Sequence, residues 1–265
     1  MPFTPAHIAA AYSFRRTRFV WSALIVGTMA PDFEYFLRMA LEGRHGHSFP
    51  GVFLLTLPLA LITLWLFHKF VKRTFVDLMP DGLRFRLEPY AGDFRFGGGA
   101  RFGLIIVSIL VGVGTHLVWD SFTHPNGWSV VRWQALQDRV RLPFIGGAPA
   151  YKILQHASTL FGMAFLLVWL MIWYRNADTA RADSAPWLSG WAMGKIATLL
   201  GIATIALVGA LAISAASTGV PENLRGVPHF LVPVVVAAIP LIWWELVLLG
   251  MVQSRRTKSQ KVASR

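Results

Sequence analysis

The sequence predicts an all-α protein that crosses a membrane several times. Of its 265 residues, 55% are hydrophobic and 14% are charged, which is too apolar for an ordinary soluble domain. Five apolar stretches are also long enough to cross a bilayer. They are residues 50–70, 102–122, 151–174, 191–214 and 230–252. We therefore expect a polytopic transmembrane helix bundle with these five spans and an N-terminal helix that is either buried or a sixth span.

The N-terminal region leaves those two alternatives open. Thr4-Pro5-Ala6-His7 is typical of a helix start, with Thr4 as the N-cap. The apolar stretch 19–30 has twelve residues, fewer than the ~20 that a spanning helix needs. It forms a re-entrant or buried segment, or it crosses together with residues 33–41. Asp32, which follows Pro31, is either a helix cap or a metal ligand.

One motif dominates the second long apolar stretch. His116, Asp120 and His124 are four residues apart, so on a helix they project from one face. Two imidazoles and a carboxylate on one stripe can bind a divalent cation, and ionisable groups inside a membrane mark functional sites. In the competing interpretation, Asp120 only pairs with a histidine and thereby joins two helices.

Two further histidines lie where they can join this motif. His47 stands in the glycine-rich loop 43–50, where no packing requires a histidine, and this favours a ligand or proton-transfer role. Ser48 and Pro50 suit the cap and first turn of the next helix. His156 lies at the start of the 151–174 stretch, where it either contributes to the motif or hydrogen-bonds a neighbouring helix.

The basic residues indicate topology and lipid contact. The net charge is +12, but Lys and Arg lie in short segments beside the apolar stretches, which fits anionic lipid better than nucleic acid. If the N-terminal stretch spans, 18 of the 25 Lys and Arg residues share a side with the C-terminus, which predicts a cytoplasmic C-terminus. That threading gathers Asp32, the loop at His47, the end of the motif helix and His156 on the other face. It leaves His7 across the bilayer.

The remaining segments complete the prediction. Residues 128–150 carry Trp and Arg in an amphipathic pattern and are expected to lie on the membrane surface over the site. We divide the chain into a metal-site domain (1–175), two additional transmembrane helices (176–252) and a basic, disordered tail (253–265). Glu245, inside the last span, is an acid with a possible function of its own.

Several short motifs carry a family resemblance. They are Met1-Pro-Phe-Thr-Pro-Ala-His7, Val26-Gly-Thr-Met-Ala-Pro-Asp32, Gly114-Thr-His116-Leu-Val-Trp-Asp120-Ser-Phe-Thr-His124 and Leu154-Gln-His156. Over roughly residues 1–175 the chain resembles an uncharacterised family of bacterial multi-pass membrane proteins (DUF4184-like). More distantly, it resembles the membrane-bound metal-dependent hydrolases, which share an N-terminal His, a Pro-Asp, a His-Ser and a His-x3-Asp element. The resemblance implies a metal set of His7, Asp32, His47, His116 and Asp120, which places His7 in the site, and it implies a bacterial cytoplasmic membrane.

Together these observations predict a metal-dependent membrane hydrolase. With no cysteine, the ligands are imidazole and oxygen, which suits zinc, with manganese or iron as alternatives. His7, Asp32, His116 and Asp120 are expected as metal ligands. His47, His124 and His156 are expected as catalytic residues, each as an extra ligand, a general acid or a partner of a ligand. The expected partners are membrane lipids and a small substrate that is amphipathic or contains phosphate, and no nucleic acid.

Two other classes of function stay open at this level. A transporter or channel with an intramembrane His/Asp relay would use the same residues, with Glu245 as a coupling acid, although no inverted repeat is visible. A structural membrane protein would use the polar network only to fix helix packing.

Overall fold

The structure is a computed structural model that describes residues 3–39, 43, 45–142, 146–177, 192–224 and 226–263. Five helical segments in it are long and apolar enough to cross a membrane. They are Phe49–Leu78, Gly99–Thr123, Ala150–Asn176, Met193–Thr218 and Val227–Arg256. This confirms the all-α class and the multi-pass character predicted from the sequence. The chain forms two compact units, which are described separately below.

The first unit contains Met1–Phe33, Arg44–Ile62 and Phe96–Asn176. Its N-terminal elements are short. They are the 3-10 turn η1 (Thr4–His7), α1 (Ile8–Ala11), the 3-10 turn η2 (Tyr12–Phe14), α2 (Trp21–Met29) and the 3-10 turn η3 (Ala30–Asp32). With nine residues, α2 is only about 13 Å long, so it does not cross a bilayer. In the described part of the chain, the region is not among the five helical segments long and apolar enough to cross a membrane, and five of the nine α2 residues are buried, which favours the buried helix over a sixth span.

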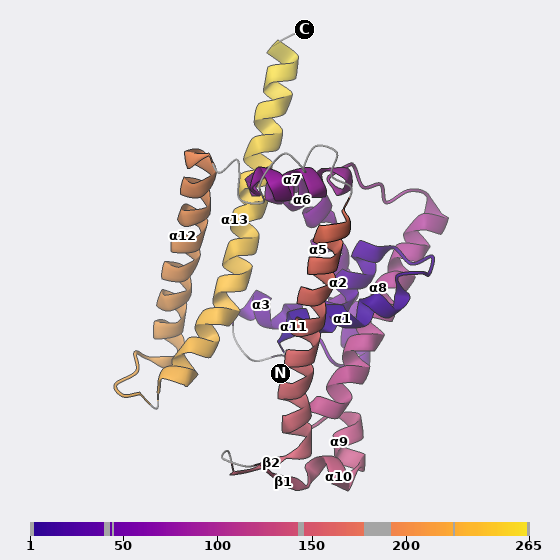
Figure 1. Cartoon of the computed structure of the whole chain (residues 1–265), viewed down its shortest axis with the longest axis vertical. Coiled ribbons are helices and arrows are strands. Elements are labelled where there is room, and N and C mark those ends of the chain that lie inside the picture. The colour runs from indigo at the N-terminus through magenta and orange to yellow at the C-terminus, as the bar shows by residue number, and fades with distance from the viewer. Residues whose placement is uncertain are drawn as a thin grey trace. The chain divides into compact units, whose positions relative to one another are not determined.

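Close packing against α8 (Gly99–Thr123) explains how such a short helix is held (Figure 1). A Cβ atom on Gly27 of α2 would lie 2.2 Å from the carbonyl oxygen of Ile109, and one on Gly112 of α8 would lie 2.4 Å from that of Leu24. The two backbones therefore touch through glycines, as in small-residue contacts between membrane helices. In addition, Val20 N donates to Ser108 Oγ at 2.9 Å. This contact fixes α2 beside the part of α8 that carries His116.

The first span is continuous but irregular. It contains α4 (Phe49–Gly51), the π-helical η4 (Val52–Thr56), α5 (Leu57–Leu66), the π-helical η5 (Phe67–Val71) and α6 (Lys72–Leu78). Ser48 caps its start by accepting a hydrogen bond from Gly51 N at 3.2 Å, as the sequence predicted. The first π-helical stretch ends two residues before Pro58, whose missing N–H leaves a carbonyl in this stretch without its usual helical hydrogen bond. The polar, Arg-rich residues 71–101 are partly helical, with α6, α7 (Asp81–Leu87) and a 3-10 turn at Glu88–Tyr90.

After α8, the chain makes a small surface structure before the next span. It comprises α9 (Trp128–Arg132), α10 (Gln134–Gln137) and the antiparallel strands β1 (Arg139–Leu142) and β2 (Gly146–Pro149), paired from Arg139 with Pro149 to Leu142 with Gly146. The hairpin was not predicted, because four-residue strands leave no clear alternation. The span α11 (Ala150–Asn176) follows, and Ala6 of η1 packs on its Gly162.

The second unit contains Glu34–Gly43, Thr63–Arg95 and Ala177–Arg265. It includes α3 (Phe33–Arg38, from Glu34 on), and its largest elements are α12 (Met193–Thr218) and α13 (Val227–Ala263), which lie side by side (Figure 1). Val247 of α13 packs with Leu66 and Val71 of the first span. The backbone of α13 is helical to Ala263, so it includes most of the basic segment after residue 252 that we expected to be disordered. The predicted domain boundaries at residues 175 and 252 stay predictions.

Candidate metal centre

Four side chains from three separate segments of the first unit converge on one point. Asp32 comes from η3, His47 from the loop before α4, and His116 and Asp120 from α8. One ligand atom of each lies within 4.8 Å of the ligand atoms of the other three, an arrangement that could hold a metal ion. Asp32, His116 and Asp120 are buried, and His47 is partly open to solvent, with 32% of its side chain exposed.

The spacing of these atoms matches a first coordination shell. The distances are 3.2 Å from His116 Nε2 to both His47 Nε2 and Asp120 Oδ2, 3.4 Å from His47 Nε2 to Asp120 Oδ2, and 3.6 Å from Asp32 Oδ1 to each imidazole Nε2. In a tetrahedral zinc site with bonds of about 2.0–2.1 Å, neighbouring ligand atoms lie roughly 3.3–3.4 Å apart. These five distances are therefore close to those of a tetrahedral zinc site.

The orientation of His116 supports this fit. Its Nδ1 lies 2.8 Å from the carbonyl oxygen of Thr28, so this nitrogen donates its N–H there, and in the neutral ring Nε2 then presents its lone pair to the cluster. The neighbouring Asp120 carboxylate also offers only lone pairs when ionised. Acceptors facing each other in a buried space repel unless a proton or a metal ion lies between them. The contact between Gly27 of α2 and Gly112 of α8 makes this hydrogen bond possible, because it brings the Thr28 carbonyl next to His116.

Asp32 is oriented by a residue that the sequence analysis assigned to another role. Thr4 Oγ1 donates a buried hydrogen bond to Asp32 Oδ2 at 2.6 Å, which turns Oδ1 toward the cluster. Thr4 is not the N-cap of η1, because Phe3 holds that position. Its place three residues before His7 was visible in the sequence, but no local pattern distinguishes a capping hydroxyl from one that reaches a carboxylate 28 residues away.

His7 lies at the edge of the cluster. Its ring stacks on His116 with centroids 4.0 Å apart, its Nε2 is 3.4 Å from Asp120 Oδ1, and only 1% of the residue is exposed. In the described part of the chain, neither ring nitrogen of His7 has a hydrogen-bond partner, and the same holds for Asp32 Oδ1 and Asp120 Oδ1. Buried polar atoms without partners cost free energy, and these four belong to candidate ligands. A cation would satisfy them.

The other predicted site residues are placed differently. His124 caps the end of α8, with Nδ1 3.2 Å from the backbone oxygen and 3.5 Å from Oδ2 of Asp120, and a quarter of its side chain is exposed. His156 is exposed on α11 and is not among the residues whose ligand atoms gather in the cluster. Glu245 belongs to the second unit.

Burial controls the protonation of the groups outside the spans. Burial, followed by the effect of the neighbouring His116, lowers the pKa of His7 to about 3, so His7 is neutral at neutral pH. Burial also raises the pKa of Asp32, against the opposing effects of His116 and the Thr4 hydroxyl. It lowers the pKa of His124, while Asp120 acts in the opposite direction. Neutral imidazoles are the form that binds metal ions.

Comparison with models of known protein families shows which family the chain belongs to. A family model described as "Domain of unknown function (DUF4184)" matches residues 1–251. The chain belongs to this family. The DUF4184 match includes the last two spans almost completely, which corrects our expectation that the family resemblance ends near residue 175. Searches of the curated proteins and of the solved structures each found no significant match.

Proposed function

We propose that the protein is an integral membrane hydrolase that uses a divalent cation to cleave a phosphoester or related bond of an amphipathic, lipid-linked substrate. The observation that carries this proposal is the cluster of Asp32, His47, His116 and Asp120, with four ligand atoms within 4.8 Å at the end of a membrane span. A nitrogen and oxygen donor set without thiolate suits zinc, with manganese and iron as alternatives. The His-x3-Asp and Pro-Asp elements shared with membrane-bound metal-dependent hydrolases also support it.

Each residue has a distinct role in this proposal. Asp32 Oδ1, His47 Nε2, His116 Nε2 and Asp120 Oδ2 would hold the cation. When bound, it supplies Lewis-acid polarisation of a phosphoryl oxygen and lowers the pKa of a water toward about 7. Thr4 and the Thr28 carbonyl keep Asp32 and His116 in the ligating orientation.

In this proposal, substrate enters and protons are transferred on the side of the cluster that is open to solvent. His47 in the cluster and His124 beside it are partly exposed, with 32% and 25% of their side chains accessible, so substrate would approach between them. Nδ1 of His124 faces Asp120, which leaves Nε2 to deliver a proton to the leaving group. His7, buried behind His116, completes the shell around Asp120 or adds a fifth ligand.

The number of spans and the distribution of Lys and Arg indicate on which side of the membrane the C-terminus lies. With five spans, 15 of the 25 Lys and Arg residues fall on the side of the C-terminus and ten on the other, so we infer a cytoplasmic C-terminus. The bias is weaker than the one predicted with six spans, because the short α2 moves the N-terminal arginines to the other side. The proposed membrane is the bacterial cytoplasmic membrane. The proposed partners are its lipids and a phosphate-containing substrate, and no nucleic acid.

A hydrolysis assay with matched histidine variants tests the proposal. The protein, reconstituted in nanodiscs and loaded with zinc or manganese, is expected to release product from a phospholipid or an alkyl phosphodiester. His116→Ala and Asp120→Asn are expected to lose this activity, and His229→Ala, on an exposed histidine of α13, is expected to retain it. Metal-dependent uptake of a solute into proteoliposomes, without product release, would instead support a transporter. Equal activity of all variants would refute the proposal.

A further inference from the structure

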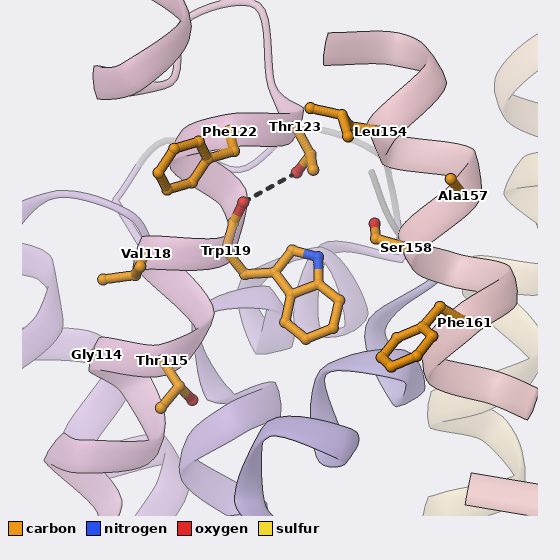
Figure 2. Close-up of a pocket in the computed structure, with 10 residues that line it drawn as sticks. All are labelled: Gly114, Thr115, Val118, Trp119, Phe122, Thr123, Leu154, Ala157, Ser158 and Phe161. Atoms are coloured by element: carbon orange, nitrogen blue, oxygen red, sulfur yellow. Dashed lines mark hydrogen bonds between the residues drawn. The ribbon is translucent and has the colours of Figure 1, made fainter. Parts of the chain in front are cut away.

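An apolar pocket lies between α8 and α11 in the first unit. Its volume is about 810 Å³, within the range of ligand sites. Val118, Trp119 and Phe122 line it from α8, and Leu154 and Phe161 line it from α11. Figure 2 shows the indole of Trp119 projecting from α8 into the space in front of Ser158 and Phe161. Both walls belong to membrane spans, and Val118 and Phe161 are about two-thirds exposed, so the pocket opens toward hydrocarbon.

Two lining residues connect this pocket with the metal cluster. The ring of Trp119 packs edge-on against His7 with centroids 5.3 Å apart, and His7 in turn lies 3.4 Å from Asp120. Thr123 Oγ1 is 3.3 Å from Nδ1 of His124, whose side chain is 25% exposed and lies 3.5 Å from Asp120. One intervening residue, His7 or His124, therefore separates each of these two lining residues from Asp120 of the cluster.

A basic, aromatic segment lies at the same end of α8. Phe122, which lines the pocket, packs edge-on against Trp133 with centroids 5.6 Å apart. The adjoining helix α9 and strand β1 carry Arg132, Arg139 and Arg141, all exposed. Guanidinium groups bind phosphate and anionic head groups. The apolar pocket therefore has the candidate cation site on one side of α8 and exposed arginines on the segment that follows the end of α8.

We propose that this pocket binds the hydrocarbon chain of a lipid phosphoester while its phosphate head group lies at the metal cluster. The inference rests on the proposed function and specifies its substrate class. A chain gains little from leaving the bilayer for an equally apolar pocket, because lipid tails are as apolar as the side chains. The head group must therefore supply the affinity, and the pocket determines which chain is aligned with the cluster. Water-soluble phosphoesters would bind the cluster but leave the pocket empty.

Glycines of α8 provide a matched pair of test variants. A Cβ atom on Gly114 or on Gly103 would meet nothing within 4 Å, so both positions accept a side chain, but only Gly114 lines the pocket. Gly114→Phe fills the pocket, and Gly103→Phe is the control. Ala157→Phe and Ala164→Phe on α11 form a second pair, because both alanines are exposed and only Ala157 lines the pocket.

The experiment is photolabelling of the zinc-loaded protein in phosphatidylcholine nanodiscs with a phosphatidylglycerol that carries a diazirine in one acyl chain. The pocket residues Val118, Phe122 and Phe161 are expected to be labelled more strongly than two reference residues. The references are Leu167 and Met171, which are exposed on α11 outside the pocket. Dodecyl phosphate is expected to remove this excess, whereas dodecanol and inorganic phosphate are not. Gly114→Phe and Ala157→Phe lose the excess, and their controls keep it.

The two proposals fail in different ways. Uniform labelling of α8 and α11, or equal competition by dodecanol and dodecyl phosphate, would overturn the pocket inference even if the wild-type protein binds metal and hydrolyses phosphoesters. Pocket labelling that dodecyl phosphate removes, in a protein that hydrolyses no phosphoester, would overturn the hydrolase proposal and leave lipid binding intact. Metal content measured on every variant shows that the cluster itself is unchanged.

Discussion

Replacing Thr4 by valine tests how the cluster is oriented without removing a ligand. Valine has nearly the same shape as threonine but cannot donate the 2.6 Å hydrogen bond to Asp32 Oδ2. A hydrogen bond to a charged group contributes about 1.5–3 kcal/mol, which corresponds to a loss of roughly 10- to 150-fold in metal affinity. Loss of a hydrogen-bond partner of a metal ligand costs a similar factor, about 10- to 100-fold. We therefore expect Thr4→Val to weaken zinc binding by one to two orders of magnitude.

The assay is zinc titration in competition with a chromophoric chelator, on protein in detergent or nanodiscs. Thr4→Ser keeps the hydroxyl and is expected to bind like the wild type. Thr28→Val removes another fully buried hydroxyl, which donates only to Ile25 O within its own helix, and it is expected to leave the affinity nearly unchanged. If Thr4→Val bound zinc as tightly as Thr4→Ser, the hydrogen bond would not orient a ligand and the reasoning would be refuted.

Three further predictions concern packing, pH and metal removal. Gly27→Ala places a Cβ atom 2.2 Å from Ile109 O, so we expect the melting temperature to fall by several degrees and zinc to bind more weakly. The control Gly103→Ala, whose Cβ atom would lie in open space, is expected to keep the stability or raise it by up to about 1 kcal/mol. Because the pKa of His7 is lowered to about 3, the unfolded state takes up its proton first as the pH falls. Metal-free protein should therefore lose stability from about pH 6.5 downward to pH 3, and His7→Gln should flatten this loss in melting curves. Chelation should lower the melting temperature, and zinc at about 100 times its Kd should restore roughly 2.7 kcal/mol of folding stability. An unchanged melting temperature in both cases would show that the cluster binds no ion.

The membrane spans were predictable because twenty-residue apolar stretches have few alternative structures. The position of the N-terminal region was not. Hydropathy alone could not distinguish a buried α2 from a sixth span, because the decision depends on backbone contact between Gly27 and Gly112, which lie 85 residues apart in sequence. The positive-inside count favoured the spanning alternative, which separates His7 from the other candidate ligands.

For the site, helical periodicity related His116 to Asp120, because residues four apart share a face. It could not supply their partners, since the hydrogen bonds from Thr4 to Asp32 and from His116 to the Thr28 carbonyl depend on tertiary packing. Proximity to the motif helix made His156 a candidate, but it is exposed on α11 and outside the cluster. Being near in the fold does not determine which face of a helix a residue occupies.

The most direct test of the account is the metal content of the purified protein and of four single variants, Asp32→Ala, His47→Ala, His116→Ala and Asp120→Ala, with His229→Ala as the control. We predict about one tightly bound zinc, manganese or iron ion per chain in the wild type and the control, and its loss in each of the four variants. A wild type that binds no metal, or variants that all retain it, would contradict the claim that these four residues form a metal centre.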